Sequence, residues 1–503
     1  MASLTLVPAY TGAMENAVQT NEVFERARLS RDARFDGRFF VGVRTTGIYC
    51  RPICPANAPK SENVTFFPSA AAASEAGYRP CLRCRPECAP GTPAWVGTST
   101  TVQRALRLIA DGGLEDGNVE SLAARLGVTG RHLRRLFAKH VGASPLTVAH
   151  TQRLHFAKRL IDETTLSMAD VSSAAGYGSV RRFNDTFRKT YGRPPRELRK
   201  EGKAAVTATA LSVLLPYRKP YDWAALLGFF AGRATPGVEI VANGDYLRAV
   251  RIGDTRGIIR VTDAGGAVSL SVHGVGTASL FPVVQRVRSL FDVDAPIDDI
   301  AAGMNRDRQL REWLGARPGV RVPGAWDGFE LAVRAILGQQ VSVKAATTFA
   351  GRIAQRYGEP VGVPEETLPN APVTLFPEPP MLARARLEHL GIIRSRAQTI
   401  RNLARAVISG DLSFDPAQTT EEFRDSLTAI RGIGNWTAEY VAMRTMKDPD
   451  AFPSSDLGLL RAFDRPGRKR LRPADLEARA EAWRPWRAYA ALLIWGSDPG
   501  AGG

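Results

Sequence analysis

All 5 cysteines of this 503-residue chain lie in one short N-terminal stretch, and their spacing is typical of metal ligands. Three residues separate Cys50 from Cys54, two residues separate Cys81 from Cys84, and a longer loop separates the pairs. Two short-spaced pairs of thiols predict one tetrahedral zinc site, with Cys88 outside it. The spacing alone leaves open whether the zinc is purely structural or serves a reactive thiol.

The residues around the cysteines favour a reactive site. The runs RTTGIYCRP and RPCLRC, within about residues 31–90, resemble the metal-binding domain of the Ada family of bacterial methyl-phosphotriester repair proteins. This resemblance implies four zinc ligands, Cys50, Cys54, Cys81 and Cys84. It also implies that Cys50 accepts the methyl group, and we expect Arg79 to contact DNA.

The chemistry of such a site is direct methyl transfer. Zinc keeps a thiol deprotonated at neutral pH, and the thiolate is the nucleophile. Four thiolates on zinc carry a net charge of about −2, which methylation of one sulfur reduces to about −1. We expect the methylated form to bind DNA more tightly, so the site would also be an electrostatic switch.

Residues 101–199 contain a duplicated pattern of helices. In each copy a glycine, Gly127 or Gly176, takes a tight turn before a second helix, which starts near Thr129 in the first copy and after an N-cap at Ser179 in the second. The pattern resembles the AraC-type helix–turn–helix domain, whose second helices enter successive major grooves of DNA. We expect DNA contacts from Arg131, Arg134, Arg135, Arg181 and Arg182. A protein-interaction module is the alternative, which the duplication and the basic charge disfavour.

The C-terminal half contains a second DNA-binding pattern. In LTAIRGIGNWTAEYVAMR, two helices flank Gly432 and Gly434, and such glycines let backbone amides approach a phosphate closely. The run FPSSDLGLLRAF follows and places Asp456 at a fixed distance. Together these runs resemble the helix–hairpin–helix glycosylases, and residues 216–496 are similar to the AlkA family of 3-methyladenine DNA glycosylases.

This second resemblance implies an enzyme that flips an alkylated base out of the duplex. The Asp456 carboxylate would stabilise the positively charged sugar, and Gln339 and Gln340 would plug the gap left in the duplex. Three aromatic residues would line the base pocket: Trp436, Tyr440 and Trp495. The alternatives are an N-cap for Asp456 and ordinary core packing for the rings.

Three absences narrow the predicted activity. Trp436 stands where related glycosylases with lyase activity carry a lysine, so we expect a monofunctional enzyme that uses water. No cysteine follows Cys88, which excludes a four-cysteine iron–sulfur cluster in the catalytic half. The Pro-Cys-His-Arg motif of the Ada methyltransferase is absent, so we expect no repair of O6-alkylguanine.

The fold class that follows is multidomain, mainly α with α+β parts. We expect linkers at 89–100 and 200–210, and four units: a small zinc-binding α/β domain (1–90), a double helix–turn–helix (100–200), a β-rich subdomain (211–297) and an all-α helix–hairpin–helix glycosylase domain (298–503). A net charge of +17 is typical of proteins that bind a polyanion, here double-stranded and alkylated DNA.

The sequence also bears on location and partners. With no signal peptide and no apolar run of ~18 residues, we expect a cytoplasmic bacterial protein at the nucleoid, without membrane contact. We expect a monomer that meets RNA polymerase at promoters. The competing interpretation is a methylation-sensing transcription activator whose glycosylase half is inactive.

Overall fold

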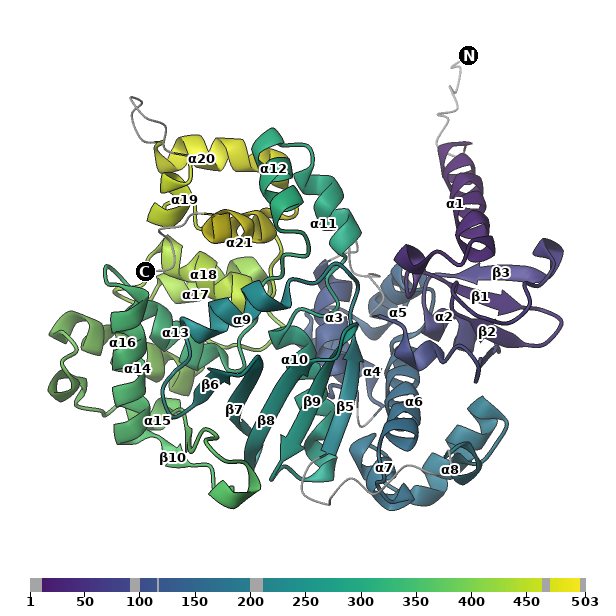
Figure 1. The fold of residues 1–503 in the computed structure, drawn as a ribbon, viewed down its shortest axis with the longest axis horizontal. Helices are drawn as coiled ribbons and strands as arrows, with labels where there is room; N and C mark the ends of the chain where they lie inside the picture. Colours follow the sequence, from purple (N-terminus) through teal and green to yellow (C-terminus); the bar gives the residue numbers. More distant parts are fainter. Residues whose placement is uncertain (1–10, 91–99, 115–116, 200–210, 464–470, 498–503) are drawn as a thin grey trace, which may run out of the picture.

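The computed structural model describes residues 11–90, 100–114, 117–199, 211–463 and 471–497. The predicted linkers at 89–100 and 200–210 lie almost entirely outside these residues. Figure 1 shows a central sheet, with the N-terminal sheet and α8 at one end of the long axis and the C-terminal helices at the other.

The N-terminal part is a four-stranded sheet with the order β3-β1-β2-β4, in which β2 and β4 are parallel. Phe39, Phe40 and Tyr49 are fully or almost fully buried around it. Its elements are α1 (Thr11–Leu29), β1 (Phe40–Val43), β2 (Ile48–Cys50), β3 (Val64–Phe67), α2 (Ala70–Glu75) and β4 (Arg79–Pro80).

The predicted duplication is present as two helix–turn–helix units joined by a long helix. Ser179 caps the last of these helices by accepting from the Arg182 N–H, which confirms the predicted N-cap. Gly127 and Gly176 have φ values of +70° and +72°, a conformation that favours glycine. The helices are α3 (Thr100–Ala110), α4 (Val119–Arg125), α5 (Gly130–His140), α6 (Pro145–Glu163), α7 (Met168–Ala174) and α8 (Val180–Tyr191).

The central sheet is antiparallel, with the order β5-β9-β8-β7-β6. Its strands are β5 (Leu211–Pro216), β6 (Glu239–Ala242), β7 (Asp245–Ile252), β8 (Thr255–Asp263) and β9 (Ala267–His273). The β-rich prediction overlooked two helices, α9 (Trp223–Ala231) and α10 (Leu280–Leu290). Helix α9 reads WAALLGFFA, and so short an apolar run has no periodicity that separates a buried helix from a strand.

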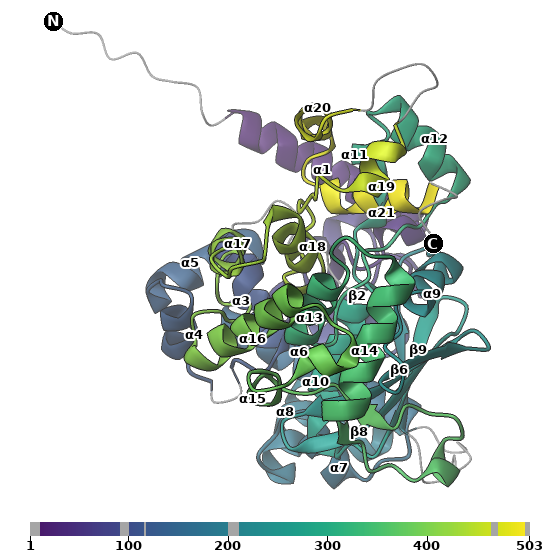
Figure 2. The same ribbon diagram turned by 90° about the vertical axis from the view of Figure 1, so that its left-hand side faces the viewer.

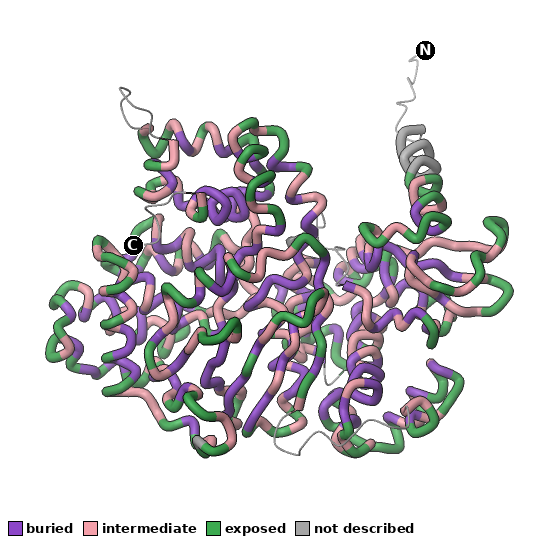
Figure 3. The backbone as a smooth tube through the Cα atoms, viewed as in Figure 1, coloured by how far each residue is buried: buried purple, intermediate pink, exposed green. Residues whose placement is uncertain are grey.

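The second helix–turn–helix unit shares its hydrophobic core with this sheet. Phe183 and Phe187 belong to the same buried cluster as Val213 and Leu270. The rings of Phe156 on α6 and Phe281 on α10 lie 5.2 Å apart, nearly edge to face. Figure 3 shows buried residues along both α6 and the strands of the sheet. The helix–turn–helix part is therefore docked on the sheet.

The C-terminal half is helical, as predicted, and the proline-rich run after residue 358 forms the small ladder β10 (Glu359–Pro360) and β11 (Thr374–Leu375) inside it. The helices are α11 (Ile297–Met304), α12 (Arg308–Ala316), α13 (Gly328–Leu337), α14 (Val343–Tyr357), α15 (Pro379–Leu382), α16 (Arg394–Ser409), α17 (Thr420–Thr428), α18 (Asn435–Thr445), α19 (Leu457–Arg461), α20 (Pro473–Ala480) and α21 (Arg487–Ser497). Among the described helices, none is both long and apolar enough to cross a membrane.

Candidate functional sites

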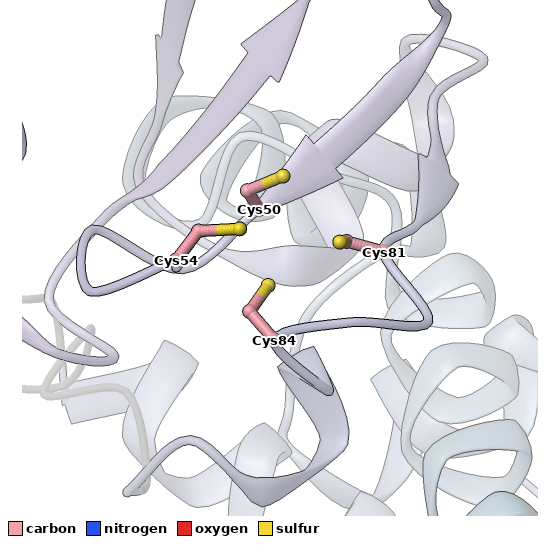
Figure 4. Close-up of side chains that lie close together, drawn as sticks. All are labelled: Cys50, Cys54, Cys81 and Cys84. Carbon is pink, nitrogen blue, oxygen red and sulfur yellow. The ribbon is translucent and has the colours of Figure 1, made fainter. Parts of the chain in front are cut away.

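Four cysteine sulfurs meet at one end of the N-terminal sheet (Figure 4). Tyr49 of β2 lies opposite Pro80 of β4, and the Cys81 N–H donates to the Tyr49 carbonyl at 2.9 Å. Because the two strands are parallel, Cys50 and Cys81 emerge side by side. Cys54 and Cys84 follow on short turns and complete the cluster.

The geometry of this cluster suits zinc. The sulfur atoms of Cys50, Cys54, Cys81 and Cys84 all lie within 4.8 Å of one another. With Zn–S bonds of about 2.3 Å, a tetrahedral site has sulfur–sulfur edges of about 3.8 Å. The Arg51 N–H points at the Cys84 sulfur from 3.3 Å, a contact that favours a charged thiolate. Cys88 is not part of the cluster, and burial raises the pKa of its thiol.

Two contacts tie the cluster to other parts of the chain. The Arg51 guanidinium donates from Nε to Asp36 at 2.8 Å and from Nη1 to the Cys84 carbonyl at 3.1 Å. The Asp36 carbonyl in turn accepts from Arg218, just after β5. On the other side, the Tyr49 hydroxyl lies 2.9 Å from Nε2 of His155 on α6, and burial lowers the pKa of His155 to about 4.

The basic residues predicted to contact DNA lie on open surface. The side chains of Arg131, Arg134 and Arg135 on α5 and of Arg181 and Arg182 on α8 are exposed. Arg134 forms an exposed ion pair with Glu120 at 2.7 Å. Arg79 is also exposed, and its guanidinium lies beside Gly192 at the end of α8, so it borders the second unit.

In the C-terminal half, Asp456 lies in a cavity of about 1300 Å³ and caps a helix, which is one of the two roles that the sequence left open. Oδ1 caps α19 by accepting from the Leu459 N–H at 3.0 Å. The same oxygen accepts from Nε1 of Trp495, and Oδ2 accepts from Nε1 of Trp436, each at 2.8 Å. The helix cap therefore holds the carboxylate against two indoles of the cavity.

The three predicted pocket aromatics converge on this carboxylate. The rings of Trp436 and Tyr440, one turn apart on α18, stack at 5.3 Å with an interplanar angle of 5°. Trp495 approaches Tyr440 from α21, with ring centroids 6.3 Å apart and tilted by 60°. All three residues line the same cavity, so ordinary core packing does not describe them.

The hairpin between α17 and α18 borders the cavity. Gly432 has φ +98°, and a Cβ there would lie 2.1 Å from Oγ1 of Thr399, so only glycine fits. Gly434 starts α18 without a side-chain cap, and a Cβ at this residue would meet nothing within 4 Å. The free amides of the first turn of α18 therefore face open space, as a phosphate site requires.

The two glutamines lie next to the hairpin. Nε2 of Gln339 donates to the Gly432 carbonyl and to Oγ1 of Thr437, both at 3.1 Å. Gln340 has φ +56°, uncommon for a residue other than glycine, and lines the cavity.

Sequence reasoning missed Phe229 and Arg233, which line the cavity, and Arg444, which contacts the pocket residue Tyr440. The guanidinium of Arg233 lies 3.9 Å above the Phe229 ring, and Nη1 of Arg444 donates to the Tyr440 hydroxyl at 2.8 Å. Burial acts to raise the pKa of Tyr440, but the charges of Arg444, Arg233 and Arg334 outweigh it and hold that pKa below its ordinary value. Arg444 is four residues after Tyr440 and so on the same helix face, a signal that could have found it.

Comparison with protein families divides the chain into four matches. Residues 23–87 match the metal binding domain of Ada, and residues 122–201 match a helix-turn-helix domain. Residues 212–327 match the AlkA N-terminal domain, and residues 333–488 match the HhH-GPD superfamily of base excision DNA repair proteins.

One relative covers most of the chain, and two others each cover a part of it. A probable bifunctional transcriptional activator/DNA repair enzyme AlkA of Mycobacterium tuberculosis is 42% identical over 475 residues, 93% of this chain and 95% of the relative. DNA-3-methyladenine glycosylase 2 of Escherichia coli is 37% identical over 290 residues, 56% of this chain and 95% of its own length. The bifunctional transcriptional activator/DNA repair enzyme AdaA of Bacillus subtilis is 31% identical over 182 residues, 36% of this chain and 84% of its own length.

Proposed function

The chain belongs to the family of bifunctional transcriptional activators and DNA repair enzymes that join an Ada metal-binding domain to an AlkA-type glycosylase, and on this premise we propose which of its residues perform each activity. It is a DNA repair protein with a DNA-3-methyladenine glycosylase, a zinc-bound methyl acceptor and a DNA-binding helix–turn–helix.

In the glycosylase half, Asp456 is the catalytic carboxylate. The open first turn of α18 binds a phosphate, and Trp436, Tyr440 and Trp495 surround the flipped base. As the bond between base and sugar breaks, positive charge develops on the sugar, and the fixed carboxylate stabilises it. The departing base takes the bonding electron pair, water attacks the sugar carbon, and the proton that the water loses passes to solvent. The observation that carries this assignment is the pair of indole hydrogen bonds to Asp456.

In the N-terminal domain, Cys50 is the methyl acceptor. Zinc, when bound, keeps the four thiols in their nucleophilic thiolate form. The Cys50 sulfur attacks the methyl carbon of a phosphotriester, a sulfur–carbon bond forms, and the carbon–oxygen bond breaks. The electron pair stays on the phosphate oxygen, which restores an ordinary diester. The half-exposed position of Cys50 at the end of β2 supports this role over that of the buried Cys84.

The helix–turn–helix domain places the same molecule at promoters. Its exposed arginines on α5 and α8 read DNA, with Arg79 beside them, and RNA polymerase is the partner that activation requires. The protein acts as a monomer in the cytoplasm, at the nucleoid, and carries four domains with the boundaries that the sequence predicts.

One experiment tests both chemical assignments. The zinc-loaded full chain is incubated with DNA treated with a methylating agent, and released bases and cysteine-containing peptides are quantified together. We expect free 3-methyladenine in multiple turnovers and one methyl group per chain, on Cys50. A methyl group on Cys88 would overturn the acceptor assignment. Methyl transfer without base release would instead favour an activator with an inactive glycosylase half.

A further inference from the structure

The exposed basic face of α8 lies well away from the glycosylase hairpin (Figure 1). Exposed basic side chains occupy both recognition helices: Arg131, Arg134, Arg135 and Lys139 on α5, and Arg181, Arg182, Arg188 and Lys189 on α8. Figure 1 places α8 in the right-hand part of the molecule and α17 and α18 left of its centre. Figure 2, turned by 90°, places α17 and α18 toward the viewer and α8 behind them.

This arrangement is fixed by contacts that leave the basic faces of the recognition helices exposed. In the first unit, Arg125 of α4 pairs with Asp415 at 2.8 Å, and Arg104 of α3 donates to the Ala417 carbonyl. Ala417, from the loop before α17, also packs against the core of that unit.

The second unit is held in the same manner by α6. Its Phe156 packs against Phe281, and the Glu163 carboxylate accepts from the Leu214 N–H at 3.0 Å. Because the contacts come from α3, α4 and α6, the basic faces of α5 and α8 remain open to DNA while the orientation of the hairpin relative to them is set.

A single short duplex cannot bind the recognition helices and the hairpin at the same time. DNA has a persistence length of about 150 bp, so a duplex of about 20 bp behaves as a straight rod. A rod seated on α5 and α8 would not curve around the molecule to reach the amides at Gly434.

We propose that one molecule binds two DNA segments at once, one on the helix–turn–helix face and an alkylated one on the hairpin and cavity. This inference rests on the proposed function for the identity of the hairpin site. At physiological salt the Debye length is about 8 Å, so two duplexes separated by more than this distance scarcely repel each other. A chain bound at a promoter would thereby present its glycosylase to a second stretch of DNA.

Native mass spectrometry of the full zinc-loaded chain tests this with two 20-bp duplexes of different mass. One duplex is undamaged, and the other carries a tetrahydrofuran analogue of an abasic site. We expect a complex of one chain with both duplexes. Saturation with the undamaged duplex should change the Kd for the abasic duplex less than threefold.

Matched charge variants locate the second duplex. Replacing Arg181 and Arg182 together by alanine should leave one duplex per chain. Replacing Arg308 and Arg311 of α12, which are equally exposed, removes the same charge elsewhere and should leave two.

Three results would overturn the proposal: one duplex per chain at saturation, two chains in every two-duplex complex, or a threefold or greater loss of abasic-duplex affinity. Loss of a duplex in the α12 variant would also contradict it. Base release is assayed in parallel. Two bound duplexes without excision would refute the glycosylase assignment and leave the two-segment binding intact.

Discussion

The indole N–H of Trp436 donates to Oδ2 of Asp456 at 2.8 Å. Asp456 is also the N-cap of α19. The cap to Leu459 fixes the position of the carboxylate, and the indoles of Trp436 and Trp495 fix its orientation. In the proposed function the helix cap and the catalytic carboxylate are the same side chain, and a substitution can separate the two roles.

Asp456→Asn separates them because asparagine caps a helix about as well as aspartate but carries no charge. We expect a folded protein that still binds alkylated DNA and whose base release falls ~100-fold or more, since a preorganised electrostatic contact is typically worth about 3 kcal/mol. Thermal unfolding, DNA binding and release of 3-methyladenine are measured on the same preparation. Near-normal excision would contradict the catalytic assignment.

Alanine at each hairpin glycine should give opposite phenotypes. Gly432→Ala places a Cβ 2.1 Å from Thr399 at a φ of +98°, so we expect a loss of stability of about 1–3 kcal/mol. Gly434→Ala meets no neighbouring atom, so stability should change by no more than about 0.5 kcal/mol. Its methyl group lies where a phosphate would approach, and DNA affinity should fall.

Urea unfolding and the Kd for abasic-site DNA distinguish the two glycine variants. Equal stability losses in both would contradict the geometry of the hairpin, and unchanged DNA affinity in Gly434→Ala would contradict its role in phosphate binding.

The contact between Tyr49 and His155 predicts an acid-sensitive attachment of the N-terminal domain. The pKa of His155 is about 4 in the folded chain, against about 6.5 in the unfolded chain, so the unfolded chain takes up the proton first as pH falls. Stability is therefore lost as pH falls from about 6.5 to about 4, by up to about 3 kcal/mol.

His155→Gln keeps a polar partner for the Tyr49 hydroxyl and removes the titration. Urea unfolding of both proteins at pH 7, 6 and 5 measures their free energies of unfolding. We expect the difference between the two free energies to change with pH, because the native protein loses more stability on acidification. If the free energies of unfolding of the two proteins fall in parallel with pH, His155 is not the cause of the acid sensitivity.

Cys88→Ser should retain one zinc per chain, because Cys88 is not part of the sulfur cluster. Cys84→Ser should lose the metal, since it removes the buried ligand that the Arg51 N–H contacts. Elemental analysis after gel filtration measures both. Zinc loss from the Cys88 variant would show that the ligand set is wrong.

The sequence alone determined the features that depend on neighbouring residues. The cysteine spacing, the cap at Ser179 and the turn glycines Gly127 and Gly176 are local patterns, and their backbone requirements are met within a few residues. The same holds for the hairpin, because the conformation of Gly432 and the start of α18 are set by the residues around them.

Only the tertiary structure decided which distant residues meet. Phe229 reaches the cavity from α9, in a different domain from Asp456, and no periodicity in the sequence links them. The ties from Asp36 to Arg218 and from Tyr49 to His155 join separate units of the chain. The placement of α8 away from the hairpin follows from a core shared between α7–α8 and the central sheet. Such contacts arise from shape and burial across the assembled fold, which local propensity does not encode.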